Sequence, residues 1–333
     1  MDPPNPFPIL RLPFLAIEEI FKAMDPIEII NFSMISKRTK GIAMHMSFYP
    51  KYKLELYMHQ RLEIRLHGTN DVVSCFYVMT SNKHMDGKIV EKSFGRYITR
   101  RVFKYDPFDE WKHLFKYIDE IFKKQAIDVL TMTLTGFVDQ KISIIDFLKA
   151  NEISVDECNL YQRDKQINVD KHTAYLLNNI KINSVLCYDV YINNDGFNPK
   201  IPKNLQELRI YNSKWIGYER LLKIDCKSVI LEKNRISNEQ WNSFIKKWIA
   251  METNQNLEYL ELDYREIEEF RTFVLYDIPH EVVDGAVKRI LKTRRNETEE
   301  ISGGIDIRRI DGKTATFFVY RELRKESFAM SIH

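Results

Sequence analysis

The most constraining feature of the sequence is a short apolar pattern that recurs along the middle of the chain. Apolar side chains occupy the first, fourth and sixth positions of five segments, which begin at Ile127, Ile182, Leu205, Cys226 and Leu257. A sixth, imperfect copy begins at Ile153, or at Val155 if it is shifted, and the copies then follow one another at irregular intervals of roughly 21 to 31 residues. The pattern is typical of buried strands, so each repeat holds one strand and one connecting segment.

The connecting segments are predicted to be helical. Ser237 and Gln240 have the spacing of a capping box, and apolar residues then recur at helical spacing from Trp241 to Ile249. Before that helix, Asn234 and Ile236 extend the fourth copy to the LxxLxLxxNxI pattern of a leucine-rich repeat. We therefore expect an irregular leucine-rich-repeat-like solenoid over residues 107–265.

A doubly wound nucleotide-binding sheet would also alternate strands and helices. The chain has only 11 glycines, and no GxGxxG or GxxxxGK sequence follows a strand to bind phosphate. The sequence therefore favours the solenoid over the nucleotide-binding fold.

The regions beside the repeats have different periods. Residues 53–79 alternate as strands covered on one face do, and residues 111–122 carry apolar side chains at helical spacing. Near the C-terminus, Asp311 and Gly312 form a hairpin turn signal between apolar segments at residues 305–310 and 317–320. We expect this hairpin to join the small β region at residues 53–79.

The N-terminal segment is predicted to form helices that need a partner. Residues 17–24 form an amphipathic helix, and the sequence Asp25-Pro26-Ile27-Glu28 begins a second helix with a capping box. Apolar residues then occupy nearly every face of the second helix as far as Ile35. Some forty residues rarely bury enough surface alone, so either the rest of the chain or another protein covers them.

These residues resemble an F-box. The resemblance covers residues 7–46 and rests on Leu12-Pro13, Ile20, Met24-Asp25-Pro26, Ile29, Phe32 and Ile35-Ser36-Lys37-Arg38. It implies a three-helix module that docks on the Skp-type adaptor of a cullin-RING ubiquitin ligase. One departure is Thr39, which stands where many F-boxes carry Trp and weakens the expected docking. The adaptor-binding residues that the resemblance implies are Leu12, Pro13, Ile20, Phe21, Met24, Ile29, Phe32 and Ile35.

Residues 108–265 resemble the type 2 F-box-associated domain, which accompanies F-boxes in a family expanded in nematodes. The segments NLQELRIYNSKWIGYERLL, CKSVILEKNRISNEQWNSFIKKWI and NLEYLEL carry this resemblance, and the C-terminal GGIDIRRIDGKTATFFVY is typical of such chains. We expect an α/β protein with an F-box at 1–50, a small β region and linker at 51–106, the repeat domain at 107–265, and C-terminal helices and a β-hairpin at 266–333.

The composition predicts neither catalysis nor a cofactor. Fifty basic and 47 acidic residues leave a formal charge of +3, which suggests no nucleic-acid or membrane partner, and no apolar run is long enough to span a membrane. The eight histidines form no HxxxH or HExxH pair, so we expect no metal site. Four widely spaced cysteines predict free thiols in an intracellular protein, cytoplasmic or nuclear, with Cys158, Cys187 and Cys226 in the repeat core. The basic run at residues 288–295 is expected to be a solvated helix end.

These observations predict a non-catalytic, substrate-recognition subunit of a Skp-cullin-F-box ubiquitin ligase. It would bind the Skp-type adaptor, and through it a cullin, with the F-box, and an unidentified protein substrate with the concave face of the solenoid. The substrate-binding residues predicted on that face are Leu186, Tyr188, Arg209, Tyr211, Ile230, Tyr259 and Glu261. The alternative is a leucine-rich-repeat-like interaction scaffold that acts without a ligase. A third hypothesis is an enzyme with a cleft between the small β region and the solenoid.

Overall fold

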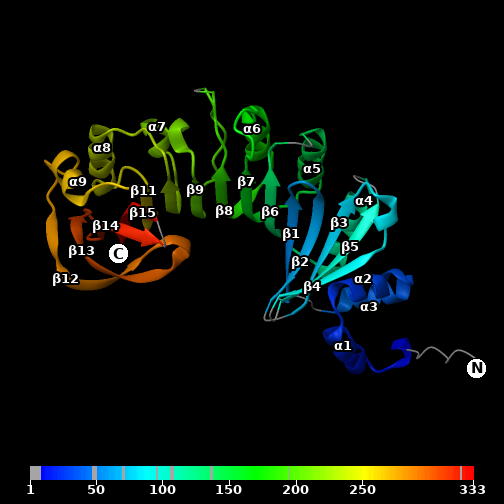
Figure 1. Cartoon of the computed structure of the whole chain (residues 1–333). Coiled ribbons are helices and arrows are strands. Elements are labelled where there is room, and N and C mark those ends of the chain that lie inside the picture. Colours follow the sequence, from blue (N-terminus) through cyan, green and yellow to red (C-terminus); the bar gives the residue numbers. More distant parts are fainter. Residues whose placement is uncertain are drawn as a thin grey trace, which may run out of the picture. The chain divides into compact units, whose positions relative to one another are not determined.

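The protein is described from a computed structural model of the chain, shown in Figure 1. The structure describes residues 9–46, 51–69, 72–94, 97–105, 109–135, 138–194, 196–322 and 325–333. It is a mixed α/β protein whose chain divides into two compact units, residues 1–132 and residues 133–333. Each unit is described separately below.

The first unit begins with the predicted helical module. A short turn at Ile9–Arg11 (η1) precedes the helices α1 (Phe14–Ala23), α2 (Pro26–Met34) and α3 (Lys37–His45). Asp25 and Glu28 form the predicted capping box at the start of α2, with Pro26 in its first turn. A second capping box, between Ser36 and Thr39, begins α3.

A mixed sheet forms the rest of this unit. The strands β1 (Tyr52–Met58), β2 (Leu62–Gly68) and β3 (Ser74–Thr80) form an antiparallel meander, which confirms the predicted strands at residues 53–79. The sequence analysis missed β4 (Ile89–Phe94) and β5 (Tyr97–Tyr105), which follow the short turn η2 (Lys83–Met85). Helix α4 (Asp109–Phe122) leads to β6 (Ile127–Thr133), which pairs in parallel with β1.

The helical module is partly covered by its own unit. Ile27, Ile29 and Ile30 of α2 are buried. Polar contacts surround them: Asp25 forms an ion pair with Arg100 of β5, the Ser33 hydroxyl lies 2.9 Å from that of Tyr117, and Lys40 lies 2.6 Å from Glu120. The chain therefore supplies part of the cover that the apolar N-terminal segment requires, and the exposed remainder is described below.

The second unit contains five parallel strands in chain order, which are β7 (Val155–Tyr161), β8 (Ile182–Asp189), β9 (Leu205–Ile210), β10 (Cys226–Leu231) and β11 (Tyr259–Asp263). Figure 1 shows the helices in a row along them, and these helices are α5 (Val138–Ala150), α6 (Asp170–Asn179), α7 (Tyr218–Leu221) and α8 (Asn238–Ile249), with the short turn η3 (Ser213–Trp215) before α7. The predicted capping box at Ser237 and Gln240 begins α8. Its apolar stripe packs on Leu260 and Leu262, so the helices cover one face of the sheet.

The repeat pattern locates the core on most strands but not on β8. Leu208 pairs with Leu186 and Ile210 with Tyr188, so Leu186 and Tyr188 occupy the helix-facing core. The pattern had placed Val185 and Cys187 there. An irregularity between β7 and β8 after Val155 adds one residue to β8, and a shift by one residue sends each side chain to the other face. The neighbouring copy follows the shifted alternative, with Val155, Cys158 and Leu160 buried.

The C-terminal region forms one helix and four antiparallel strands. These are α9 (Ile267–Phe273), β12 (Glu281–Lys292), β13 (Thr298–Arg308), β14 (Thr314–Glu322) and β15 (Lys325–Ile332), with the turn η4 (Arg294–Asn296) between β12 and β13. The predicted hairpin exists between β13 and β14. Its predicted pairing with residues 53–79 is wrong, because the hairpin is flanked by β12 and β15, and β15 pairs with β11. The basic run at residues 288–295 is likewise a strand end and a turn, not a helix end.

Candidate functional site

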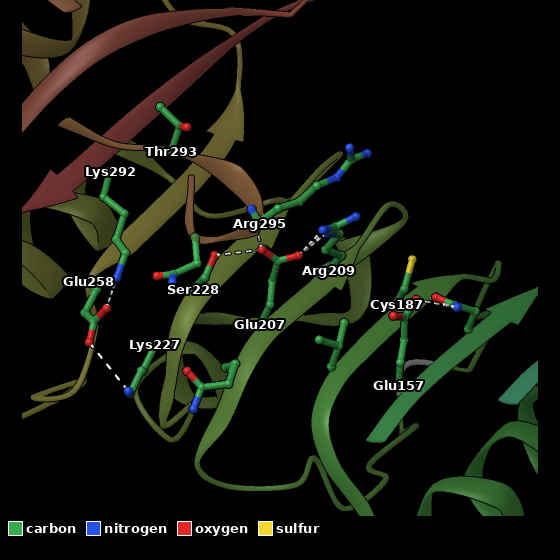
Figure 2. Close-up of a pocket in the computed structure, with 14 residues that line it drawn as sticks. Glu157, Cys187, Glu207, Arg209, Lys227, Ser228, Glu258, Lys292, Thr293 and Arg295 are labelled. Atoms are coloured by element: carbon green, nitrogen blue, oxygen red, sulfur yellow. Dashed lines mark hydrogen bonds and ion pairs between the residues drawn. The ribbon is translucent and has the colours of Figure 1, made fainter. Parts of the chain in front are cut away.

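A cavity of about 440 Å³ opens in the second unit, on the sheet face that the helices do not cover (Figure 2). Successive side chains of a strand point to opposite faces, so the residues between Leu186, Tyr188, Leu208 and Ile210 line this second face. Turn η4 and the end of β12 form a wall of the cavity. The lining residues are Glu157, Asn159, Val185, Cys187, Gln206, Glu207, Arg209, Lys227, Ser228, Glu258, Lys292, Thr293, Arg295 and Asn296.

Glu207 on β9 organises the cavity. Its side chain is buried, and its carboxylate accepts hydrogen bonds from the Arg209 guanidinium, the Ser228 hydroxyl at 3.4 Å and the Arg295 backbone N–H at 2.9 Å. Burial alone would lower the pKa of Arg209, but the adjacent Glu207 outweighs burial and raises it. A buried carboxylate needs such partners, so Glu207 fixes both the Arg209 side chain and turn η4 in place.

A second ion cluster lies at the β10 and β11 side of the cavity. Glu258 forms an ion pair with Lys292 of β12, and its other oxygen lies 3.9 Å from Lys227 (Figure 2). The Lys292–Glu258 pair ties the end of β12 to the parallel sheet.

Two charges in the cavity lack an oppositely charged partner. Within the described part of the chain, the Arg295 guanidinium has no carboxylate partner, and Figure 2 shows this side chain extending away from Glu207. The Glu157 carboxylate on β7 accepts a hydrogen bond from the Asn159 amide at 2.7 Å but meets no cation among the same residues. The cavity therefore offers one unpaired positive and one unpaired negative group.

Val185 and Cys187 of β8 also line the cavity. Burial raises the pKa of the Cys187 thiol to about 11, so the thiol stays protonated near neutral pH. Cys75, Cys158 and Cys226 are also free and buried, and burial raises the pKa of each. The cysteines therefore pack as small apolar side chains and are not activated as nucleophiles.

Most of the substrate-binding residues predicted from the repeat pattern are not on the surface. Leu186 and Tyr188 are buried toward the helices for the reason given above. Ile230 and Tyr259 face the other side but are buried with Leu291, Phe318 and Tyr320 of the C-terminal strands. Glu261 is buried beneath Arg294, which donates to both of its carboxylate oxygens, and beside the Tyr259 hydroxyl at 2.8 Å. Of the predicted set, Arg209 and Tyr211 are half-buried and remain accessible on the open face.

The basic run and the alternating strand positions were the signals that sequence reasoning passed over. Arg295 and Lys292 come from that run, which was interpreted as a solvated helix end, and Glu157 and Glu207 alternate with core residues of β7 and β9. Their convergence depends on β12 and η4 reaching β9 and β10, over a sequence separation that no local pattern reveals.

The N-terminal helices expose a second candidate surface. Phe14 and Leu15 of α1 are 55% and 73% exposed, and Met34 and Ile35 at the end of α2 are 51% and 72% exposed. The Arg38 guanidinium donates to the Leu10 carbonyl at 3.3 Å, which brings the start of α1 to the α2–α3 junction. We call the four exposed side chains of these two helix ends the apolar end.

Comparison with known families matches both parts of the chain. Residues 9–51 match the F-box domain, and residues 196–262 match the family described as F-box associated. The chain therefore contains an F-box and an F-box-associated region. The F-box match contains the three N-terminal helices and their apolar end. The F-box-associated match contains β9, β10 and nearly all of β11, and it supplies part of the cavity lining, including Glu207, Arg209 and Glu258.

Two curated relatives come from Caenorhabditis elegans. The chain is 19% identical to the Skn-1 dependent zygotic transcript 15 protein over 93% of both chains. It is 23% identical to the E3 ubiquitin-protein ligase hecw-1 over 75% of this chain, which spans 22% of that relative. No solved structure matches the chain.

The structure separates the eight predicted adaptor-binding residues of the F-box into three groups. Pro13 and Ile35 are exposed, and Phe21 and Ile29 are buried inside the module. The half-buried residues are Leu12, Ile20, Met24 and Phe32. Phe14, Leu15 and Met34 are exposed as well, although the sequence analysis did not include them among the predicted adaptor-binding residues.

The F-box and the F-box-associated domain together give the chain the general role of an F-box substrate adaptor. Across the described ranges, no group of three or more His, Cys, Asp or Glu residues is arranged to hold a metal ion. None of the described helices is both long and apolar enough to cross a membrane.

Proposed function

We propose that this F-box protein is a substrate-recognition subunit of a Skp-cullin-F-box ubiquitin ligase. The observation that carries the proposal is the apolar end of the F-box, because Phe14, Leu15, Met34 and Ile35 leave a large apolar surface in water. Exposed apolar patches on soluble proteins mark interaction sites. The Skp-type adaptor covers this patch and holds the chain, through the cullin, in the ligase.

The predicted adaptor-binding residues then have two roles. Pro13 and Ile35 contact the adaptor together with the accessible parts of Leu12, Ile20, Met24 and Phe32. Phe21 and Ile29 act from inside: the Phe21 ring lies 5.3 Å from that of Phe32 in an edge-to-face arrangement, which holds α1 against α2.

The second unit binds the protein substrate. We assign its strand and helix units to a leucine-rich-repeat-like solenoid, which is supported by the parallel order of β7 to β11 and the buried LxxLxL positions. Catalysis by the complex is then a matter of proximity, because the chain holds a substrate lysine near a conjugating enzyme on another subunit. The proposal places the protein inside the cell, in the cytoplasm or nucleus.

Ile35→Asp tests this function, with Ile310→Asp as a matched control. The two isoleucines are 72% and 71% exposed, but Ile310 lies outside the F-box, at the β13–β14 turn. A carboxylate at position 35 would be buried without a partner on docking, so we expect co-precipitation of a purified Skp-type adaptor to fall at least about tenfold. Both variants should unfold at the wild-type temperature because both sites face water. Equal adaptor recovery with both variants would contradict the proposal and favour the scaffold without a ligase.

A further inference from the structure

The cavity in the second unit has a specific ligand chemistry. Two carboxylates hold most of the charged lining in place. Glu207 holds Arg209 and turn η4, and Glu258 holds Lys292. Arg295 is different, because its backbone is anchored to Glu207 while its guanidinium has no carboxylate partner in the described ranges. A guanidinium presents a planar fork that matches a carboxylate or phosphoryl group.

The cavity opens onto a surface suited to an extended peptide rather than to a small molecule. Tyr161 of β7 pairs with Asp189 of β8, and Tyr211 follows the end of β9, so these three residues form the next row on the same open face. Tyr161 is 38% exposed and Tyr211 is half-buried. Tyrosines on an accessible face beside an arginine are typical of protein contact surfaces.

The acidic residues of this face limit how many negative charges a ligand can carry. Glu157 has no cationic partner among the described residues, and Asp189 lies in the adjacent row. Like charges that face each other across an interface oppose binding. A run of acidic residues is therefore repelled, whereas one anionic group between neutral or basic neighbours is accepted.

We propose that the cavity is a binding site for a single anionic side chain of an extended protein segment, with Arg295 as the residue that recognises the anion. The anion is the carboxylate of Asp or Glu, or a phosphorylated side chain, since both present the same oxygen geometry to the guanidinium. The site rests on the proposed function, because the segment belongs to the substrate of the F-box protein.

The test is selection from a random peptide library displayed on phage, with the full-length chain as target and the Arg295→Gln variant in parallel. Gln keeps a side chain at a residue whose φ is 56°, so the turn has the same backbone cost in the variant. Arg235→Gln is the control, since Arg235 is an exposed arginine outside the cavity. Peptides enriched by the wild type and by the control should share one acidic residue, and those enriched by Arg295→Gln should not.

Synthetic versions of the enriched peptides then give the affinities by fluorescence anisotropy. Replacing the shared acidic residue with Gln should weaken binding to the wild type about tenfold to a hundredfold and leave binding to Arg295→Gln unchanged. A peptide with phosphoserine at that position is then compared with the acidic peptide. Tighter binding of the phosphoserine peptide assigns the site to a phosphorylated side chain, and tighter binding of the acidic peptide assigns it to a carboxylate. A peptide in which acidic residues also flank the position should bind less tightly than the original.

Three outcomes would overturn the site: no enrichment above Arg295→Gln, enrichment without a shared acidic residue, or tighter binding of the acidic run. Co-precipitation of the adaptor with the same protein preparations distinguishes failure of the anion site from failure of the proposed ligase function. If the adaptor binds and the peptides fail these tests, the anion site is wrong while the ligase role stands.

Discussion

Thr39 stands where the sequence departs from the common F-box pattern, and its hydrogen bonds show what a threonine contributes at this position. Its hydroxyl accepts from the Ser36 backbone N–H at 2.9 Å and donates to the Ser36 carbonyl at 2.8 Å. The Ser36 hydroxyl accepts from the Thr39 backbone N–H at 3.1 Å, which completes the capping box of α3. Trp has no hydroxyl and cannot make these bonds, so Thr39 contributes to the stability of the α3 start.

Asp311 is a carboxylate whose protonation gives a defined pH dependence. Two hydrogen bonds from the Arg309 guanidinium, at 2.9 and 2.6 Å, hold the pKa of Asp311 at about 2, below its ordinary 3.8. The Arg309 guanidinium is itself buried, 5.1 Å from the centre of the Trp248 ring. A depressed pKa stabilises the fold above the ordinary value, and the contribution is lost as the pH falls through the folded value.

We therefore expect Asp311→Asn to lower the free energy of unfolding near neutral pH, with an effect that shrinks below about pH 4 and vanishes only below about pH 2. Denaturant titrations of both proteins at a series of pH values give this difference directly. A loss of stability that is the same at all pH values would show that the Arg309 pair does not depend on the charge of Asp311.

The C-terminal strands β14 and β15 bury both of their faces. Phe317 and Phe328 pack with Phe270 of α9, with ring centroids 4.5 to 6.0 Å apart, whereas Phe318 and Ala329 on the opposite face cover Ile230 and Tyr259. Because β15 also pairs with β11, these strands close the end of the parallel sheet, where an exposed edge would favour aggregation.

Phe328→Ala should therefore destabilise the protein by about 3–5 kcal/mol, since it leaves a cavity in this aromatic cluster. Phe273→Ala removes the same ring from a site that is 55% exposed, and its effect should stay within about 0.5 kcal/mol. Urea titrations of the two variants make the comparison. Similar midpoints for both would mean that β15 contributes little to the stability of the second unit.

Elements defined by local chemistry were predicted from the sequence, whereas elements defined by distant contacts were not. The capping boxes at Asp25 and Ser237 depend on residues three positions apart, and the structure confirms both. The predicted core face of β8 was wrong because one added residue shifts the alternation of side chains between the two faces of the sheet. The repeat pattern gives no sign of that added residue. The prediction of a helix end for the basic run was wrong because a strand and a helix end can both carry exposed Lys and Arg.

The candidate site was predictable only in part, for the same reason. Arg209 and Tyr211 follow from strand alternation, and they do lie on the open face. The covering of Ile230, Tyr259 and Glu261 requires β12 to β15 to return onto β10 and β11, and Arg295 enters the cavity by the same return. Those contacts join residues that lie tens of positions apart in the sequence.

At the scale of the whole molecule, the chain offers two surfaces with opposite chemistry. The apolar end of the F-box suits a lasting contact, because burial of apolar surface is not screened by salt as ion pairs are. The charged cavity of the second unit suits exchangeable binding, because ion pairs near water are modest in energy and screened by salt. The proposed function needs both, since a subunit of this kind would stay with its ligase while substrates come and go.

The most direct measurement is a calorimetric titration of a purified Skp-type adaptor into the full-length chain at several temperatures. Docking through Phe14, Leu15, Met34 and Ile35 buries apolar surface, so we predict saturable one-to-one binding with a negative heat-capacity change that is largely independent of salt. Ile35→Asp should weaken the binding and Ile310→Asp should not. Absence of binding, or binding that disappears as salt is raised and is indifferent to Ile35→Asp, would contradict the assignment of the F-box as the adaptor-docking module.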